Sequence, residues 1–238
     1  MSAMKRLHPE FDIPEINGLT IDSRKVEKGD FFLPLKGQNN DGHQFISEAE
    51  SSGASLAFVE TPVETSLLTK QVQSTRTLLY DLVKEFRSEL SYPLIGITGS
   101  NGKTTTKDLL FHVLSEKMDV MKTEGNYNST IGAPLSLLSF EKNADIGIIE
   151  MGANQPGEIE RICSVIKPNM GLITNIGNAH LANFESKNEI SKTKSALFES
   201  LPSNGVAFIN LDDPYILKMN ILCSRIEYSL NTTADYQG

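Results

Sequence analysis

The sequence predicts an α/β protein of two units, a small amino-terminal α/β unit and a larger unit with a mainly parallel sheet. From residue 93 onward, short apolar runs alternate with apolar stripes at helical spacing, which favours a parallel sheet covered by helices. A glycine-rich turn separates the first of these runs from its helix. An earlier helical stripe ends at Ser91-Tyr92-Pro93, a typical domain joint. We therefore predict one domain over 1–90 and a second over 91–238.

The first unit is predicted from three short segments and one long helix. Phe31 to Leu35 is a candidate strand, Phe45 to Ser51 a candidate helix and Ser55 to Val59 a second candidate strand. A closing helix is indicated by apolar residues at helical spacing, which are Leu78, Leu79, Leu82, Val83, Phe86 and Leu90.

The second unit is predicted from strands and helices in strict alternation. Strands are expected near 94–98, 119–123, 145–151, 169–175 and 205–210, and helices near 103–117, 157–166 and 188–201. Ligands of such sheets bind at the carboxyl ends of the strands, so polar residues just after each strand are the candidates for function.

Composition excludes several classes of protein. The 238 residues are 39% apolar, which is ordinary for a soluble globular protein with a core, and the net charge of −8 argues against a general nucleic-acid binder. The first residues lack the apolar stretch of a signal peptide, and no later run approaches the length of a membrane span. We expect a cytoplasmic protein, in which Cys163 is a buried, reduced thiol.

The segment from Gly96 to Thr106 predicts a phosphate-binding loop. Gly99 and Gly102 let the backbone turn its N–H groups inward around an anion, and the helix that follows directs its positive end to the same place. Lys103 then supplies a charge for phosphate oxygens, and the Thr104 hydroxyl is placed to hold Mg²⁺. Five residues separate Gly96 from Gly102, instead of the four of the common P-loop pattern. We take nucleoside triphosphate binding as the starting hypothesis.

Three further polar residues are candidates, each with an ordinary alternative. Glu150 ends an apolar strand and can bind Mg²⁺, or it is a solvated strand-end carboxylate. His180 follows the strand near 169–175 and is either a ligand or a structural histidine. Lys194, near the start of a helix, would by itself be a solvated charge. From the residues alone, the chain is a Mg²⁺-dependent nucleoside triphosphatase or transferase.

Several motifs in one order make a more specific resemblance. They are Gly99-Ser-Asn-Gly-Lys-Thr-Thr105, Gly125-Asn-Tyr-Asn-Ser-Thr-Ile-Gly-Ala-Pro134, Glu150-Met-Gly-Ala-Asn154, Asn178-Ala-His-Leu181 and Lys194-Ser-Ala-Leu-Phe198, preceded by Asp22-Ser-Arg24 and Asp41-Gly-His43. Together they resemble the Mur ligase family over nearly the whole chain. The resemblance is strongest to the branch of the family that joins D-alanyl-D-alanine to UDP-N-acetylmuramoyl-tripeptide in peptidoglycan precursor synthesis.

The resemblance implies an ATP-dependent amide ligase that works through an acyl phosphate. It implies a uridine-nucleotide domain followed by a P-loop ATPase domain, with ATP and two Mg²⁺ ions as cofactors and a carbamylated Lys194. The two substrates above would be its partners, and no protein partner is implied. Family enzymes have a further carboxyl-terminal domain that brings the amine substrate, and nothing before Gly238 corresponds to it. We expect residues 1–238 to bind nucleotide, and the UDP precursor as well, but to ligate poorly.

The resemblance also assigns residues to roles. Lys103, Lys194 and His180 would be catalytic, and Thr104, Glu150 and His180 would hold metal. The nucleotide would contact Gly99, Ser100, Asn101, Gly102, Lys103, Thr104 and Thr105. The UDP-muramoyl-peptide would contact Ser23, Arg24, Asn126, Asn128 and Asn154.

Three alternatives remain open from the sequence. A folylpolyglutamate synthase-type ligase shares the central ATPase, although the segment Asp22 to Arg24 and the segment Glu150 to Asn154 argue against it. A non-catalytic nucleotide-binding module is the second alternative, and a generic P-loop kinase or GTPase is the third. Lys194 discriminates the last of these, because only a ligase of this kind needs it.

Overall fold

The computed structural model describes residues 2–37, 40–177 and 183–238. The chain divides into two compact units, Met1–Glu85 and Phe86–Gly238. Helix α3 (Thr75–Glu89) contains the division between them. Each unit has its own sheet, so each is described by itself below.

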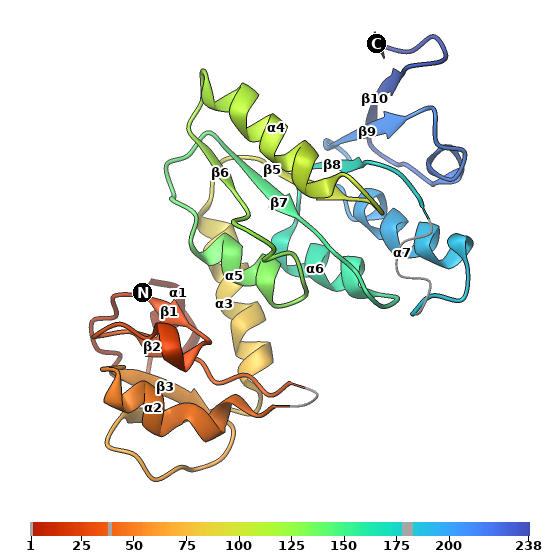
Figure 1. Cartoon of the computed structure of the whole chain (residues 1–238). Coiled ribbons are helices and arrows are strands. Elements are labelled where there is room, and N and C mark those ends of the chain that lie inside the picture. Colours follow the sequence, from red (N-terminus) through yellow and green to blue (C-terminus); the bar gives the residue numbers. More distant parts are fainter. Residues whose placement is uncertain (1, 38–39, 178–182) are drawn as a thin grey trace. The chain divides into compact units, whose positions relative to one another are not determined.

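The first unit contains a four-stranded parallel sheet in the order β1-β2-β3-β4. Its strands are Leu19–Thr20, Phe31–Phe32, Leu56–Val59 and Leu68–Gln71. The helices are α1 (Ser2–Leu7), α2 (Ile46–Ser51) and the start of α3, with 3₁₀ turns η1 at Ser23–Lys25 and η2 at Gly42–Phe45 (Figure 1). Phe32, Ile46 and Val59 belong to a core between the sheet and α2.

The first unit also corrects two boundaries predicted from the sequence. The strand expected over 31–35 ends at Phe32, because Pro34 has no N–H to donate to a neighbouring strand. The helix expected over 45–51 begins at Ile46, since Phe45 belongs to the preceding 3₁₀ turn. Strands β1 and β4 were not predicted. They are short and only partly buried, so they lack the continuous apolar run that marked β3.

The second unit contains a seven-stranded parallel sheet in the order β11-β10-β9-β8-β5-β7-β6. Its strands are Leu94–Thr98 (β5), Val120–Lys122 (β6), Ile146–Glu150 (β7), Met170–Ile173 (β8), Val206–Asn210 (β9), Ser224–Ser229 (β10) and Tyr236–Gln237 (β11). Its helices are α4 (Lys103–Ser115), α5 (Gly132–Leu138), α6 (Glu158–Ile166) and α7 (Lys187–Glu199), with a 3₁₀ turn η3 at Ile216–Lys218. The predicted α/β fold with a mainly parallel sheet is confirmed.

The helices lie on the two faces of this sheet (Figure 1). Helix α4 covers one face, where Leu110 and Leu114 pack against Ile95, Ile97 and Ile148. Helices α5, α6 and α7 contact one another in sequence along the other face. Only some apolar residues of α4 face the sheet. Leu110 and Leu114 pack against it, whereas Leu109 and Val113 are exposed to solvent.

The order of the strands brings the carboxyl ends of three central strands, and the polar residues that follow them, close together. Strand β5 lies between β7 and β8, and the chain passes from one side of β5 to the other after β7. Ligands bind outside the carboxyl ends of strands at such a switch point. In the strand register Glu150 pairs with Ile97 and Thr98 pairs with Ile173, so the loops after β5, β7 and β8 meet at this edge.

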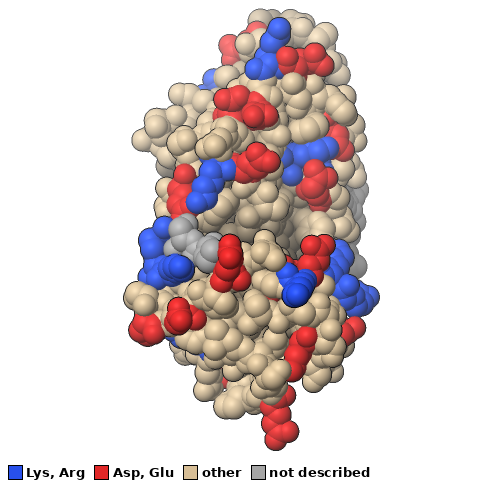
Figure 2. Space-filling model, turned by 90° about the vertical axis from the view of Figure 1, so that its left-hand side faces the viewer, with Lys and Arg blue, Asp and Glu red and all other residues tan. Residues whose placement is uncertain are grey.

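Surface charge, helix length and the burial of Cys163 were also considered in the sequence analysis. On the face drawn in Figure 2, basic and acidic side chains are interspersed. No helix in the described parts of the chain is long and apolar enough to cross a membrane. Cys163 is a free thiol buried on α6, and burial raises its pKa to about 11, which keeps the sulfur protonated and unreactive.

Candidate nucleotide and metal site

The glycine loop joins the end of β5 to the start of α4. Gly99 has φ +145° and Gly102 has φ +79°, conformations that side-chain-bearing residues rarely adopt. A Cβ on Gly99 would also collide with Oγ1 of Thr174, whereas one on Gly102 would meet open space. Gly99 is therefore required for close approach of two loops, and Gly102 for the backbone turn that starts the helix.

A second loop, residues 174–177 after β8, holds the glycine loop in place. The backbone N–H groups of Ser100 and Asn101 donate to the carbonyl oxygen of Asn175 at 2.9 Å and to its Oδ1 at 3.1 Å. The Asn175 side-chain amide donates back to the Asn101 carbonyl at 3.0 Å, and the Gly177 N–H donates to the Ser100 hydroxyl at 2.8 Å.

This arrangement bears on Ser100 and Asn101, two of the residues predicted to contact the nucleotide. Because the N–H groups of Ser100 and Asn101 donate to Asn175, the N–H groups left to face an anion would be those at the start of α4. The first N–H groups of a helix lack intrahelical acceptors and carry its positive partial charge. Gly102, Lys103, Thr104 and Thr105 supply these groups.

Lys103 folds back over the glycine loop. Its ammonium donates to the carbonyl oxygens of Gly99 at 2.9 Å and Ser100 at 3.3 Å. Burial lowers the pKa of Lys103, and the nearby Glu150 carboxylate partly offsets that effect. The ammonium is thus anchored above the loop, where phosphate oxygens would replace the carbonyls as its partners.

Glu150 is the centre of a buried polar cluster at the end of β7, with an exposed fraction of 1%. Thr104 donates its hydroxyl to Oε2 of Glu150 at 2.9 Å, and Asn128 donates its amide to Oε1 at 2.7 Å. The ordinary alternative, a solvated strand-end carboxylate, is therefore wrong. Asn128, which is predicted to contact substrate, thus also holds the predicted metal ligand.

Lys107 belongs to this cluster and was missed by the sequence analysis. Its exposed fraction is 2%, its Nζ lies 3.7 Å from Oε2 of Glu150, and it donates to the Thr123 carbonyl at 2.9 Å. A signal was available, because Lys107 stands three residues after Thr104 and so lies on the same face of α4. Its contacts tie α4 to the loop after β6.

Two oxygens of this cluster fit a magnesium ion. The Thr104 hydroxyl and Glu150 Oε2 are hard oxygen donors 2.9 Å apart, close to the separation of adjacent ligands in an octahedron with bonds of about 2.1 Å. The Lys107 charge beside the same carboxylate means that protein oxygens alone would hold a cation weakly. The described residues contain no group of three or more His, Cys, Asp or Glu side chains able to hold a metal. Phosphate oxygens would have to complete the site, as in Mg²⁺–nucleotide complexes.

Lys194 is buried on α7 rather than solvated, with an exposed fraction of 5%. Burial lowers the pKa of Lys194 to about 8, and repulsion from Lys103 adds to the shift. The structure thus brings Lys194 close enough to the glycine-loop lysine for the two ammonium groups to repel each other. The other predicted catalytic residue, His180, lies outside the described residues with the rest of Asn178 to Leu181.

The remaining predicted substrate residues lie at exposed or structural positions. Asn126 and Asn154 are exposed after β6 and β7. In the first unit, Ser23 is buried and donates its hydroxyl to Glu48 Oε2 at 2.6 Å. Arg24 is exposed and makes a two-point ion pair with Asp22 at 2.8 and 2.9 Å.

Comparisons with known proteins place this architecture in a family. Residues 97–238 match the Mur ligase middle domain, and residues 15–87 match a region described as the Mur ligase family, catalytic domain. The chain belongs to the Mur ligase family. These residues correspond to the amino-terminal and middle domains of Mur ligases, as the resemblance predicted.

Individual Mur ligases are similar over nearly the whole chain. The UDP-N-acetylmuramoyl-tripeptide–D-alanyl-D-alanine ligase of Bacillus subtilis is 36% identical over 97% of this chain and 51% of its own length. The enzyme of the same name from Escherichia coli is 35% identical over 83% of this chain and 44% of its own length. The chain therefore spans about half the length of these curated relatives.

Solved structures agree with the sequence comparisons. MurF from Acinetobacter baumannii superposes with a TM-score of 0.89 at 31% identity, covering 95% of this chain and 52% of that one. MurF ligase from Thermotoga maritima, solved in complex with ADP, has a TM-score of 0.82 at 33% identity, covering 90% of this chain and 50% of its own.

Proposed function

We propose that this Mur ligase chain provides the nucleotide-activating part of a UDP-N-acetylmuramoyl-tripeptide–D-alanyl-D-alanine ligase. The observation that carries the proposal is the convergence of Lys103, Thr104 and Glu150 at the switch point of the sheet, around a loop fixed for an anion. The names of the relatives supply the substrates, and the ADP complex of a relative supports ATP use. We propose cytoplasmic action in peptidoglycan precursor synthesis.

The proposed reaction has two displacement steps. A carboxylate oxygen of the tripeptide attacks the γ-phosphorus of ATP, the bond from that phosphorus to the β,γ-bridging oxygen breaks, and ADP leaves. The amine of D-alanyl-D-alanine then attacks the acyl carbon, loses a proton, and phosphate departs with the bonding electrons. Lys103 and the N–H groups at the start of α4 would orient the phosphates and stabilise the charge that develops on them.

Thr104 and Glu150 would hold Mg²⁺, which when bound offsets the repulsion between the carboxylate and ATP. Asn128 keeps the Glu150 carboxylate in one orientation by holding its other oxygen. A second Mg²⁺ with His180 as a ligand stays a prediction from the family resemblance. Contacts of the UDP precursor also stay predictions, at Ser23, Arg24, Asn126, Asn128 and Asn154.

Lys194 is proposed to act as a carbamate. The neutral amine nitrogen attacks the carbon of carbon dioxide, the nitrogen loses a proton, and the side chain becomes an anion. The lowered pKa of Lys194 supports this step, because a larger fraction of the side chain is uncharged near neutral pH. A carbamate would also replace the repulsion from Lys103 by attraction.

Nucleotide binding tests the first part of the proposal. Isothermal titration of the chain with ATP·Mg²⁺ should show one site, and Lys103→Met should weaken binding at least tenfold because the phosphate charge loses its partner. Lys117→Met, at an exposed position beyond the end of α4, is the matched control and should bind like the parent. Equal affinity in all three proteins would contradict the proposal.

Turnover tests the second part. ADP release should depend on the UDP-tripeptide and on D-alanyl-D-alanine, and a folate in place of the UDP-tripeptide should not support it. Because the similarity covers about half of each relative, we expect residues 1–238 by themselves to bind but ligate poorly. In a protein that turns over, Lys194→Ala should abolish ligation, and short carboxylates should restore part of it. Unchanged activity in that variant would exclude the carbamate. ADP release that depends on both substrates would exclude the non-catalytic module.

A further inference from the structure

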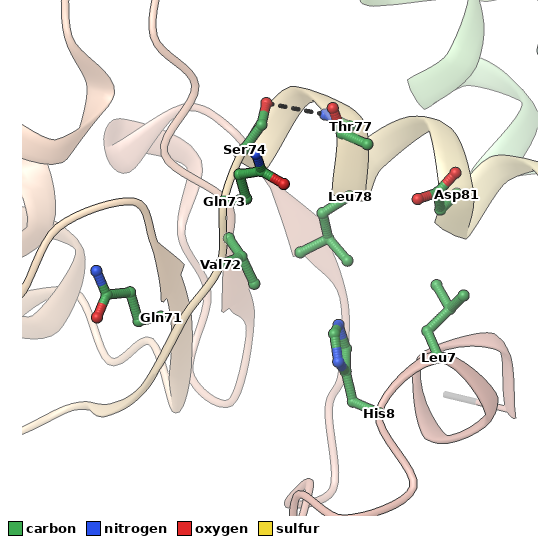
Figure 3. Close-up of a pocket in the computed structure, with 9 residues that line it drawn as sticks. All are labelled: Leu7, His8, Gln71, Val72, Gln73, Ser74, Thr77, Leu78 and Asp81. Carbon is green, nitrogen blue, oxygen red and sulfur yellow. Dashed lines mark hydrogen bonds between the residues drawn. The ribbon is translucent and has the colours of Figure 1, made fainter.

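Two polar features of the described chain are not used by the function proposed above. One is a cavity of about 650 Å³ in the first unit, between the end of α1 and the start of α3 (Figure 3). The Ser74 hydroxyl in its wall accepts the Thr77 N–H at 3.2 Å, so it stabilises the first turn of α3 rather than marking a ligand. The other feature is the ammonium group of Lys107, which faces a defined target in the second unit.

The Lys107 ammonium is held in place by the backbone rather than by the carboxylate that it faces. It donates to the carbonyl oxygens of Thr123 at 2.9 Å and Gly125 at 3.4 Å, and Lys107 is buried. Its distance of 3.7 Å from Oε2 of Glu150 makes an ion pair but is too long for a hydrogen bond. The charge of Lys107 therefore stays beside Glu150 whether or not a cation binds there.

Both oxygens of Glu150 take their hydrogen bonds from other side chains. Oε2 accepts from the Thr104 hydroxyl at 2.9 Å, and Oε1 accepts from the Asn128 amide at 2.7 Å. Lys107 thus adds a positive charge to the proposed metal site without occupying a ligand position. A lysine that only joined α4 to the loop after β6 would need its two carbonyl contacts but not this ion pair.

The charges around Glu150 favour a polyanion over a bare metal ion. Burial lowers the pKa of Lys103, and the Glu150 carboxylate partly offsets that effect, so Lys103 is a second cation acting on this carboxylate. Asp108 lies 3.7 Å from the Lys107 ammonium, but it is more exposed and pairs with Lys122 at 2.8 Å. One carboxylate therefore faces two ammonium groups. A triphosphate is attracted by this excess of positive charge, whereas a free divalent cation is repelled.

We propose that Lys107 makes metal binding at Thr104 and Glu150 conditional on the nucleotide. Its fixed charge weakens the site for a free divalent cation. By neutralising Glu150, it also removes the repulsion that the carboxylate would exert on a triphosphate. The site therefore takes the metal together with the nucleotide or after it. Lys107 is a positioning residue in this scheme, and the inference rests on the proposed nucleotide role of the site.

Manganese binding without nucleotide tests the effect on the metal. Mn²⁺ takes the same oxygen ligands as Mg²⁺, and the electron paramagnetic resonance signal of the free ion falls when it binds. Lys107→Met removes the charge, and Lys107→Gln removes it while keeping an N–H donor for the Thr123 carbonyl. Each variant should bind Mn²⁺ about tenfold more tightly than the parent. The gain should vanish when Glu150→Gln is added, and the exposed Lys117→Met should bind like the parent.

ATP binding in EDTA tests the effect on the nucleotide. Without metal, the two Lys107 variants should bind ATP about tenfold more weakly than the parent, because Glu150 then repels the phosphates. With Mg²⁺ present the loss should be smaller. Tighter Mn²⁺ binding together with weaker metal-free ATP binding separates the charge of Lys107 from a structural role, since a damaged fold would weaken both.

The outcomes distinguish this inference from the proposed function. No gain in Mn²⁺ affinity in either Lys107 variant, with ATP·Mg²⁺ binding by the parent intact, would overturn the inference alone. Failure of the parent to bind ATP·Mg²⁺ would overturn the nucleotide function and the inference with it. Glu150→Gln in the otherwise unchanged chain should leave Mn²⁺ binding as it is. A marked loss there would show that the parent already takes the free ion, and would overturn the inference even if neither Lys107 variant folded.

Discussion

Burial is the property of single residues that most altered the roles expected from the sequence. Lys194 reads as a solvated charge in the sequence, yet it is 5% exposed on α7 and repelled by Lys103. Glu150 reads as either a solvated carboxylate or a metal ligand, and its three polar neighbours exclude the first. The chemistry of each side chain depends on water exclusion, which a local sequence pattern does not encode.

The buried Lys194 predicts a pH-dependent stability. Its pKa is about 8 in the folded chain against 10.5 for the exposed group, so between these values the unfolded state binds more protons and stability rises with pH. Below about pH 8 both states are protonated and the full cost of burying the charge remains, on the order of 3 kcal/mol. Lys194→Met should therefore be more stable than the parent at pH 7, with the difference disappearing by about pH 10.5.

Urea unfolding in bicarbonate-free buffer at several pH values measures this difference. Lys192→Met, two residues earlier and less buried, is the control and should show no such trend. A constant difference between Lys194→Met and the parent across this range would contradict a lowered pKa for Lys194 in the folded chain. Added bicarbonate should stabilise the parent alone if the amine forms a carbamate.

Two elements act together to form the glycine loop. The loop after β5 is shaped as much by residues 174–177 after β8 as by its own glycines, through hydrogen bonds at Ser100 and Asn101. Strand pairing of β5 with β8 brings these two loops together. The loop can therefore keep its shape with five residues between Gly96 and Gly102, instead of the common four, because hydrogen bonds from a neighbouring loop help to hold it.

The contribution of the neighbouring loop is testable at Asn175. Asn175→Ala removes two side-chain hydrogen bonds to Asn101, worth about 1–3 kcal/mol together. Without them the loop should be less well ordered for phosphate, and ATP·Mg²⁺ should bind about tenfold more weakly. Asn204→Ala, in an exposed turn, is the control. Affinity unchanged by Asn175→Ala in a titration would mean that the glycines alone shape the loop.

At the scale of the whole molecule, the chain is two compact units with separate sheets and cores. The proposed nucleotide site lies wholly in the second unit. Units with their own cores can unfold separately, so one unfolding free energy would not describe the chain. A ligand of one unit should stabilise that unit first.

Calorimetry should therefore resolve two unfolding transitions. ATP·Mg²⁺ at about a hundredfold excess over its dissociation constant should raise the transition of the second unit by about 5–10 °C and leave the other nearly unchanged. Phe58→Leu identifies the transition of the first unit by lowering it, and Ile148→Val does so for the second, since both side chains are fully buried. A single transition that shifts as a whole would show that the two units unfold as one.

The sequence by itself determined the class of fold, most strands and helices of the second unit, and the glycine turn between β5 and α4. These depend on local patterns: apolar runs, helical spacing and glycines between a strand and a helix. The motif order also determined the family. It did not find the short helices α1 and α5. It also missed the short strands β1, β4, β10 and β11, whose residues are mostly exposed or half-buried and carry little apolar signal.

Only the tertiary structure decided which side chains act together. Lys107 joins Glu150 and Thr104, Asn128 holds the same carboxylate, and Asn175 uses the N–H groups expected to bind phosphate. It also decided that Nε2 of His8 is buried without a hydrogen-bond partner. The physical reason is that parallel strands distant in sequence bring their ends to one edge, where distances and exclusion of water set hydrogen bonds and charge.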